Sequence, residues 1–202
     1  MPATQLGRRE RKKLAVRDNI CRETVRLIER YGVEGVTIDA ICDCVDIAKK
    51  TFYNYYATKG DLLNDILRSE LLQRTEQLID SVIESGRDFA GQLELILEVF
   101  SERDHDSSGL ERELIAYSVG ALSTNLNEGG QQLAVINGMF RKLFDFNAHE
   151  LKPGLSPAFC SEMAVGMFNA ITLNRLHDPD YNTDKRYAEL LTFLKSSMLA
   201  KA

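Results

Sequence analysis

Apolar residues recur at intervals of three and four along most of the 202-residue chain, which is the spacing of amphipathic helices. The first such stripe comprises Ile20, Thr24, Leu27, Ile28 and Tyr31, and three more follow between residues 89 and 171. No segment alternates apolar and polar residues over the length of a strand, and no Asn-Gly or Asp-Gly pair signals a hairpin. The pattern predicts an all-α protein.

Cap residues and glycines predict where the helices begin and end. Prolines stand only at positions 2, 153, 157 and 179, so none interrupts a helix between residues 3 and 152. Gly32 and Gly35 end the first predicted helix, Thr37 caps a short second one, and Thr58 caps a long helix over residues 59–84. Later breaks are expected at residues 85–86, 104–108, 125–130, 153–157 and 177–183, which gives about nine helices.

Residues 33–59, VEGVTIDAICDCVDIAKKTFYNYYATK, predict two short helices joined by a tight turn. The first covers Thr37–Cys44, the turn is Val45-Asp46-Ile47, and the second begins at Ala48. Two short helices in this arrangement, packed on a longer first helix, form a helix-turn-helix. The second helix of such a unit enters the major groove of DNA with its N-terminal residues, which are Lys49, Lys50 and Thr51 here.

This segment resembles the DNA-binding domain of the TetR family of bacterial transcriptional regulators over about residues 14–67. The residues that carry the resemblance are Tyr31-Gly32, Thr37-Ile38, Ile41, Ile47, Thr51-Phe52-Tyr53-Asn54-Tyr55-Tyr56, Lys59 and Leu62-Leu63. Two positions depart from the family's usual pattern: Asp46 replaces a turn glycine and Cys42 replaces another small residue. Aspartate tolerates the left-handed conformation better than most residues, so the turn is still expected.

The resemblance implies a set of DNA contacts: Thr37, Lys49, Lys50, Thr51, Tyr53, Asn54, Tyr55 and Lys59. Lysine reaches guanine edges or phosphates, and tyrosine hydroxyls reach phosphates. Four nearly contiguous rings span the whole circumference of a helix, so some must point outward; Phe52 and Tyr56 are expected to face the core. Thr37 either caps its helix only or also receives a phosphate. Lys59 is either a phosphate contact or a solvated surface lysine.

The resemblance further implies two domains, a helix-turn-helix domain at residues 1–60 with a basic arm at 1–13, and an effector-binding and dimerisation domain at 61–202. The arm either contacts DNA or is only a solvated start of the first helix. Candidate lining residues of an apolar effector pocket are Phe100, Tyr117, Met139, Phe140, Phe144 and Met167. Candidate residues of a dimer interface formed by the last two helices are Met163, Phe168, Ile171, Leu190, Leu191, Leu194 and Met198.

The net charge of −5 conceals an asymmetry along the chain. Residues 1–60 hold 12 Lys and Arg against 8 Asp and Glu, a net of +4, and residues 61–202 hold 13 against 22, a net of −9. This division suggests that only the N-terminal part meets a polyanion. No apolar run is long enough to span a membrane, and the polar, basic N-terminus is no secretory signal, so a cytoplasmic protein is expected.

The favoured function is a ligand-responsive repressor that binds a palindromic operator as a homodimer and is released by a small, largely apolar effector. Two alternatives are weighed against it: a helical enzyme, and an adaptor or architectural protein with the same fold but no effector-controlled operator binding. The chain has no nucleophile elbow, glycine-rich phosphate loop or HExxH motif, so no enzyme is predicted. Its histidines and cysteines lack metal-ligand spacing, so no metal or other cofactor is expected, and the four cysteines are interpreted as structural and reduced.

Overall fold

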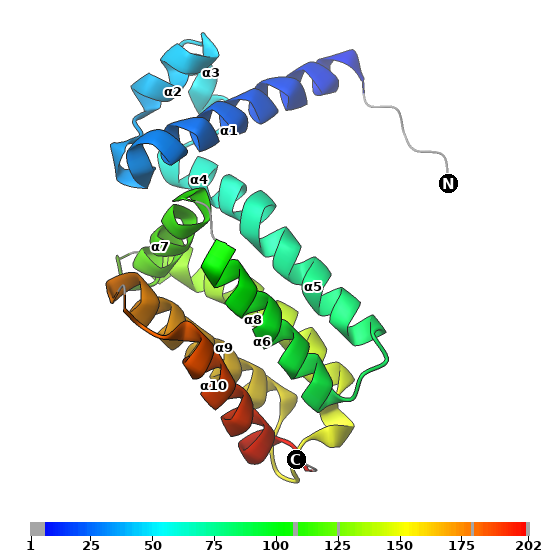
Figure 1. Cartoon of the computed structure of the whole chain (residues 1–202). Helices are drawn as coiled ribbons and strands as arrows, with labels where there is room; N and C mark the ends of the chain where they lie inside the picture. The colour runs from blue at the N-terminus through cyan, green and yellow to red at the C-terminus, as the bar shows by residue number, and fades with distance from the viewer. Residues whose placement is uncertain (1–6, 107–108, 125, 179, 201–202) are drawn as a thin grey trace. The chain divides into compact units, whose positions relative to one another are not determined.

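The computed structural model describes residues 7–106, 109–124, 126–178 and 180–200. Within these ranges all the secondary-structure elements are helices (Figure 1). The one β interaction among them is an isolated bridge between Leu151 and Leu199. The described residues form nine α-helices if the two helices that flank the π-helical segment Arg68–Leu72 are counted as one. The prediction of an all-α protein is confirmed. No described helix is long and apolar enough to cross a membrane.

The chain divides into two compact units, which are described separately below. Unit 1 comprises Met1–Glu70 and Gly109–Leu114, and unit 2 comprises Leu71–Ser108 and Ile115–Ala202. The division does not fall at residue 60, where the sequence analysis drew it, because helix α4 (Lys59–Leu67) buries its apolar face within unit 1. The segment Gly109–Leu114, the start of helix α7 (Gly109–Thr124), also belongs to unit 1.

Unit 1 is built on a long helix, α1 (Arg8–Gly35), followed by the short helices α2 (Ile38–Val45) and α3 (Lys49–Tyr53) and then by α4. The predicted caps are confirmed: the Thr37 hydroxyl accepts from the backbone N–H of Ala40, and Thr58 forms a capping box with Asp61. The buried apolar residues of unit 1 are Ile20, Ile28, Val33, Val36, Ile41, Cys42, Phe52, Tyr56, Leu62, Leu63, Ile66, Leu67, Leu110 and Leu114.

Two left-handed residues shape the turns of unit 1. Gly32 has φ 71° and kinks α1 one turn before its end at Gly35, so both glycines that were predicted to end the helix mark its last turn. Asp46, at φ 56° and ψ 53°, ends α2 in the left-handed conformation that was expected of it. Tyr31, assigned to the buried stripe of the first helix, is instead 54% exposed beside the Arg30 guanidinium.

The long helix expected over residues 59–84 contains a π-helical segment, Arg68–Leu72, between α4 and α5 (Gln73–Glu84). A π-helical turn inserts an extra residue into the α-helical register, so the face that is buried before it does not continue in the same register after it. Nothing in the spacing of apolar residues marked this change.

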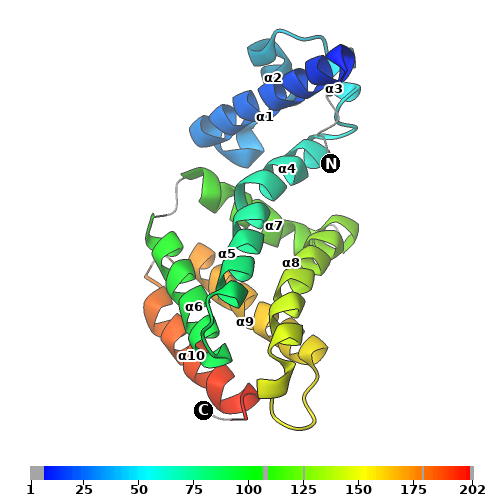
Figure 2. The same ribbon diagram turned by 90° about the vertical axis from the view of Figure 1, so that its right-hand side faces the viewer.

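Unit 2 consists mainly of helices that run side by side in Figures 1 and 2. They are α5, α6 (Phe89–Asp106), α8 (Leu126–Phe146), α9 (Pro157–His177) and α10 (Thr183–Met198), with the later part of α7 and a 3-10 turn at Ala148–Glu150. The break predicted at residues 125–130 is wrong for Gly129 and Gly130, because α8 already begins at Leu126 and continues through them. Glycine costs a helix interior only about 1 kcal/mol each, and packing of the following turns offsets that.

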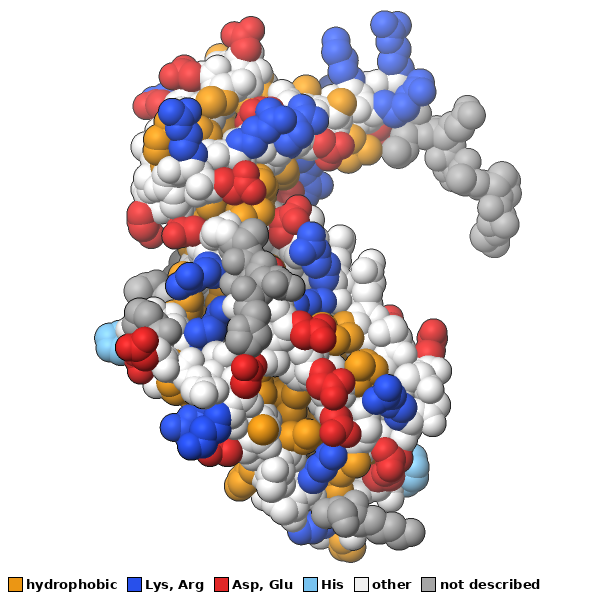
Figure 3. Space-filling view, viewed as in Figure 1, with side chains coloured by type: hydrophobic (Ala, Val, Ile, Leu, Met, Phe, Trp, Pro, Cys, Tyr) orange, Lys and Arg blue, Asp and Glu red, His pale blue; other side chains and the backbone are white. Residues whose placement is uncertain are grey.

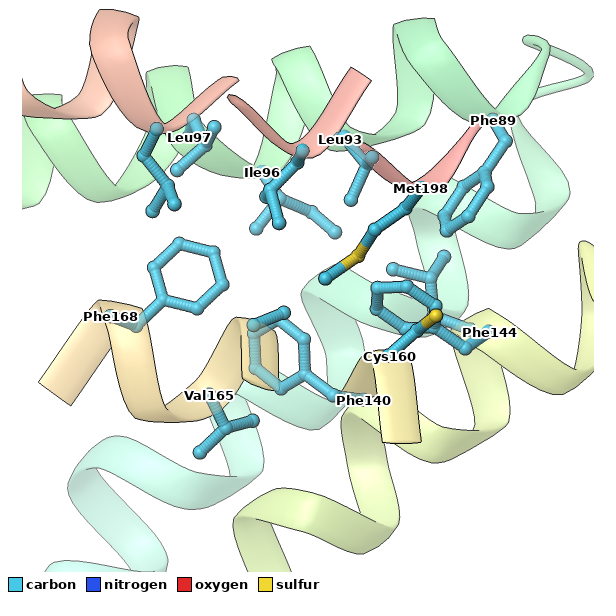
Figure 4. Close-up of a cluster of buried hydrophobic side chains, with 14 of the residues drawn as sticks. Phe89, Leu93, Ile96, Leu97, Phe140, Phe144, Cys160, Val165, Phe168 and Met198 are labelled. Carbon is cyan, nitrogen blue, oxygen red and sulfur yellow. The ribbon is translucent and has the colours of Figure 1, made fainter. Parts of the chain in front are cut away.

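Aromatic pairs fill the core of unit 2 (Figure 4). The rings of Phe89 and Phe144 meet edge to face with centroids 5.0 Å apart, and both side chains are fully buried. Phe140 and Phe168 form a second pair at 5.2 Å. These contacts join α6, α8 and α9 into one core.

We expect Phe144→Ala to lower the free energy of unfolding by about 3–5 kcal/mol, because it removes a fully buried ring and leaves a cavity that close-packed helices cannot fill. The measurement is urea unfolding followed by far-ultraviolet circular dichroism. The matched control is Phe146→Ala in the same helix, where the ring is 56% exposed and the change should cost less than about 1 kcal/mol. Equal losses in the two variants would contradict the packing described here.

Candidate nucleic-acid interface

The short helix α3 is held in place by two buried aromatic rings, one within the helix and one just after it. Phe52 is fully buried, Tyr56 is 5% exposed, and their centroids lie 6.0 Å apart. The chain enters the helix through the left-handed Asp46 and an extended Ala48. The sequence-based prediction that Phe52 and Tyr56 face the core is confirmed.

The remaining residues of this segment are presented to solvent to different degrees. Tyr53 is 52% exposed, with its ring edge against Phe52, and Lys49, Lys50 and Asn54 are also exposed. Thr51 and Tyr55 are half-buried. Thr37 is exposed at the start of α2. One continuous stretch of α3 therefore offers two ammonium groups, a phenol and an amide to a partner.

Lys49 is paired with an acidic residue of α2. Its Nζ lies 2.5 Å from Oδ1 of Asp39, and both side chains are more than 60% exposed. The hydrogen bond to Asp39 raises the pKa of Lys49. Asp39 was missed in the sequence because ten positions separate the two residues and no helical spacing relates them. Lys50 has no ion-pair partner among the described residues.

The Lys59 side chain is only partly solvated, and a hydrogen bond holds its ammonium group in place. Its Nζ donates to the backbone carbonyl of Val33 at 2.6 Å, and the side chain is half-buried. The N–H of Val33 in turn donates to Oε2 of Glu113 at 2.8 Å. Both backbone groups that follow the Gly32 kink are thus satisfied by charged side chains from α4 and α7. Glu113 was missed, since 80 positions separate it from Val33.

A polar cluster joins α1, α4 and Tyr56, which lies shortly after the end of α3. Arg17 donates from Nε to Oδ2 of Asp65 at 2.9 Å and from Nη2 to Oδ1 at 2.6 Å. The Tyr56 hydroxyl donates to the same Oδ2 at 2.6 Å, and Cys21 Sγ lies 3.2 Å from that hydroxyl. These four side chains, here called the Asp65 cluster, tie the base of α3 to the long helix.

The Asp65 cluster shifts the pKa of each member. Burial alone would raise the pKa of Asp65, but hydrogen bonds from Tyr56 and Arg17 outweigh it, and the pKa is lowered. Burial and the bond to Asp65 raise the pKa of Tyr56. Burial is also the main cause of a raised pKa at Cys21. A thiol with a raised pKa is a poor nucleophile, which agrees with a structural role for this cysteine.

The basic start of the chain is helical from Arg8 onward. The exposed cations of its first two turns, Arg8, Arg9, Arg11, Lys12 and Lys13, project at the N-terminal end of α1 (Figure 3). Residues 8–13 are therefore the beginning of a helix and not an extended arm, while residues 1–6 of the predicted arm lie outside the described residues.

Two of the candidate pocket residues in unit 2, Phe100 and Phe140, belong to one aromatic group. Phe100, Phe140 and the further residue Phe168 have centroids 5.2–6.5 Å apart, and Met139 and Met167 pack half-buried against the same core. Tyr117 is half-buried on α7. Phe144 is fully buried and packs edge to face on Phe89, and the candidate pocket residues as a set remain a prediction.

The candidate dimer residues need a larger correction. Phe168, Ile171, Leu190, Leu194 and Met198 are each 7% exposed or less and belong to the core of unit 2, so they offer no surface to a partner. Leu191 is half-buried and Met163 is 42% exposed. Helix α9 is apolar on more than one side, and spacing alone could not tell its buried face from its exposed face.

The structure contains no group of three or more His, Cys, Asp or Glu side chains arranged to hold a metal ion, within the residues it describes. His149 and His177 are exposed, and the side chain of His105 lies outside the described residues. The four cysteines are unpaired, with Cys42 and Cys160 buried, Cys21 half-buried and Cys44 exposed.

Comparison with known proteins relates the N-terminal part of the chain to one family by sequence. Residues 20–66 match the sequence model of "Bacterial regulatory proteins, tetR family". A 56-residue segment is 32% identical to the HTH-type transcriptional regulator TcmR of Streptomyces glaucescens, and the match covers 28% of this chain and 25% of that relative.

Solved structures share the fold over nearly the whole length. A TetR-family transcriptional repressor, FadR of Thermus thermophilus in complex with lauroyl-CoA, superposes with a TM-score of 0.76 at 18% identity, covering 92% of this chain and 96% of that one. SmeT, the repressor of the Stenotrophomonas maltophilia multidrug efflux pump SmeDEF, gives 0.71 at 12% identity, covering 91% and 90%. At such identities the likeness establishes the fold only.

The Asp65 cluster predicts a pH-dependent contribution to stability. Because the folded-state pKa of Asp65 is lowered, its contribution is present above the unfolded-state pKa near 3.8 and is lost as the pH falls below it. We expect Asp65→Asn to cost about 1–2 kcal/mol of unfolding free energy at pH 7, a figure reduced for the solvent exposure of Arg17. The difference between variant and wild type should shrink as the pH falls below about 4.

Urea unfolding at a series of pH values measures this difference, with Asp80→Asn as the control, since Asp80 pairs with Lys142 at an exposed position of unit 2. A cost that is independent of pH would mean that the Asp65 carboxylate is not the charged centre of the cluster.

Proposed function

The chain belongs to the TetR family of DNA-binding transcription regulators, and from that premise we propose that it is a repressor. In this proposal a homodimer binds a palindromic operator through the helix-turn-helix of each protomer. A small-molecule effector binds in unit 2 and favours a form of the dimer with lower operator affinity. The family comprises regulators and not enzymes.

The observation that carries the proposal is the division of the α3 segment into a buried and an exposed half. Phe52 and Tyr56 anchor the helix, which leaves Lys50, Tyr53 and Asn54 exposed together. Exposure of a large ring beside a cation has no benefit for folding, whereas it suits contact with phosphates, sugars and base edges. The net charge of +4 over residues 1–60 supports the same interpretation.

A different surface from the one expected supports dimerisation. Phe159, Met163 and Leu173 are 42–51% exposed on α9, and Phe193 is 51% exposed on α10. The positions 159, 163, 166, 170 and 173 alternate by four and three, with the exposed Gly166 and Ala170 completing the line. Such a spacing forms one apolar stripe along a helix and is typical of helix–helix interfaces. We therefore propose that this stripe, here called the α9 stripe, and Phe193 form the dimer contact.

The central experiment is selection of bound fragments from a random DNA pool at about 0.15 M salt, where non-specific binding is weak. We expect wild type to enrich a palindrome and the double variant Lys50→Ala/Tyr53→Ala to lose it. The matched control, Lys185→Ala/Tyr31→Ala, removes one exposed lysine and one exposed tyrosine outside α3 and should enrich the same palindrome. Failure of folded, dimeric wild type to enrich any sequence would favour an adaptor or architectural role.

Asp39 is predicted to restrain DNA binding. Since Asp39 neutralises Lys49 in the free protein, Asp39→Asn should raise affinity for the selected operator and for random DNA. One more cation then faces the phosphates, so the slope of log K against log salt should steepen by about 0.9. Fluorescence anisotropy at several salt concentrations gives the slope, and Asp43→Asn, which removes an exposed charge from the same helix, is the control. Identical slopes for the two variants would show that the Lys49 pair has no part in binding.

The α9 stripe makes a prediction about assembly. Met163→Glu/Phe193→Glu places two charges on the proposed contact and should weaken the dimer at least about 100-fold. Sedimentation equilibrium measures the association constant. Phe146→Glu, at an equally exposed ring of α8, should leave it unchanged. A dimer that survives the double change would contradict the proposed contact.

A further inference from the structure

Arg175 is a buried charge whose hydrogen-bonding capacity is only partly used. The side chain is 13% exposed, and its Nη1 lies 3.1 Å from Oδ1 of Asp104 and 3.4 Å from the Asp104 carbonyl. Its Nε and Nη2 are buried and have no hydrogen-bond partner among the residues that the structure describes. A guanidinium stays charged at any physiological pH, and a buried unpaired donor costs about 1–3 kcal/mol. Arg175 also continues the buried face of α9 that contains Phe168 and Ile171, so it is directed into unit 2.

The two unpaired nitrogens have a specific geometry. Nε and Nη2 lie on the same edge of the guanidinium plane, and this edge can hold both oxygens of one carboxylate. The chain itself contains the completed version of this arrangement, because Arg17 uses its Nε and Nη2 to hold the two oxygens of Asp65. At Arg175 the same edge has no acidic side chain among the described residues.

The charge beside Arg175 is already committed elsewhere. Asp104 accepts a hydrogen bond from the Tyr187 hydroxyl at 3.1 Å as well as the bond from Arg175. Burial and the proximity of Asp104 raise the pKa of Tyr187, so this phenol remains a neutral donor. Asp104 thus fixes the orientation of the guanidinium through one nitrogen and leaves the Nε–Nη2 edge to another acceptor.

A second unpaired polar group lies on the neighbouring helix. Oδ1 of Asn137 on α8 is buried, and no described side chain or backbone group forms a hydrogen bond with it. Asn137 precedes Phe140 by one turn, Asp104 follows Phe100 by one turn, and Arg175 follows Phe168 by two turns. Since α8 runs opposite to α6 and α9 (Figures 1 and 2), all three polar residues lie toward the same end of the aromatic group Phe100, Phe140 and Phe168.

We propose that this end of unit 2 binds a monocarboxylate with an apolar body. The Nε–Nη2 edge of Arg175 holds the carboxylate. Oδ1 of Asn137 accepts a hydrogen bond from a ligand that carries a donor group, and the three phenylalanine rings contact the apolar part. The inference rests on the proposed function, since it names the chemical class of the effector. A carboxylate is favoured over a phosphate because a dianion would add a second negative charge beside Asp104 within an acidic domain.

The test is calorimetric titration of the full-length protein with a panel of straight-chain and ω-phenyl carboxylates of six to twelve carbons, each paired with its primary amide and its phosphate monoester. We expect at least one acid to bind at least about tenfold more tightly than its amide, which is the difference expected for loss of a charge-assisted bidentate contact. Arg175→Lys keeps the charge beside Asp104 but lacks the bidentate edge, and it should abolish this preference. Arg186→Lys, at an exposed arginine of α10, should retain it.

If Arg175→Lys fails to fold, Asn137→Asp supplies the second test, because a carboxylate at that position should repel the acids more than the amides. Equal affinities of acids and amides, a preference that survives both changes, stronger binding by the phosphate monoesters, or no binding by any acid would each overturn the proposal. Operator binding by the same samples is measured in parallel. Operator binding without acid binding would refute only the ligand class, whereas acid binding without operator binding would refute the proposed repressor.

Discussion

A helix of five residues cannot determine its own orientation, and the interface of unit 1 depends on how α3 is held. One turn of helix forms at a net cost in isolation, since fixing its dihedral angles is rewarded by very few hydrogen bonds. Burial of Phe52 and Tyr56 supplies the missing free energy, and the Asp65 cluster fixes where the Tyr56 ring stands relative to α1. The exposed positions of α3 follow from these anchors, because side chains on a helix turn together about its axis.

Two lysines of unit 1 that are candidate DNA contacts, Lys49 and Lys59, already have partners within the protein. Lys59 satisfies the Val33 carbonyl and Lys49 meets Asp39, so each would have to change partner or share it when a phosphate arrives. Under the proposed function, such exchange would reduce affinity for DNA of any sequence, because the cation is already partly neutralised. The internal pairs would then favour release from non-specific DNA. Lys50, whose described surroundings hold no acidic partner, is the cation least affected by this competition.

Sequence reasoning succeeded where the cause was local. The caps at Thr37 and Thr58, the left-handed Asp46 and the inward Phe52 all depend on residues within a few positions, so their spacing predicts them. The Asp65 cluster and the Glu113 contact join residues 48 and 80 positions apart, and no periodicity relates such pairs. Five of the seven candidate dimer residues are buried in the core for a third reason. Both sides of α9 are apolar, and only packing decides that Phe168 is buried while Met163 is exposed.

Each unit contains one arginine whose Nε–Nη2 edge is placed to hold a carboxylate, Arg17 in unit 1 and Arg175 in unit 2. The two edges differ in whether a carboxylate of the chain fills them. In unit 1 the edge of Arg17 is filled by Asp65, so that part of the protein is stable without any ligand. In unit 2 the corresponding edge of Arg175 is buried and unpaired, which costs the ligand-free form free energy that an anion would recover. Conformations of unit 2 that let water reach Arg175 compete with the one described here when no acid is bound. A carboxylate would then act by shifting this balance, since it binds well only to the form in which the guanidinium and the three rings are closed around it.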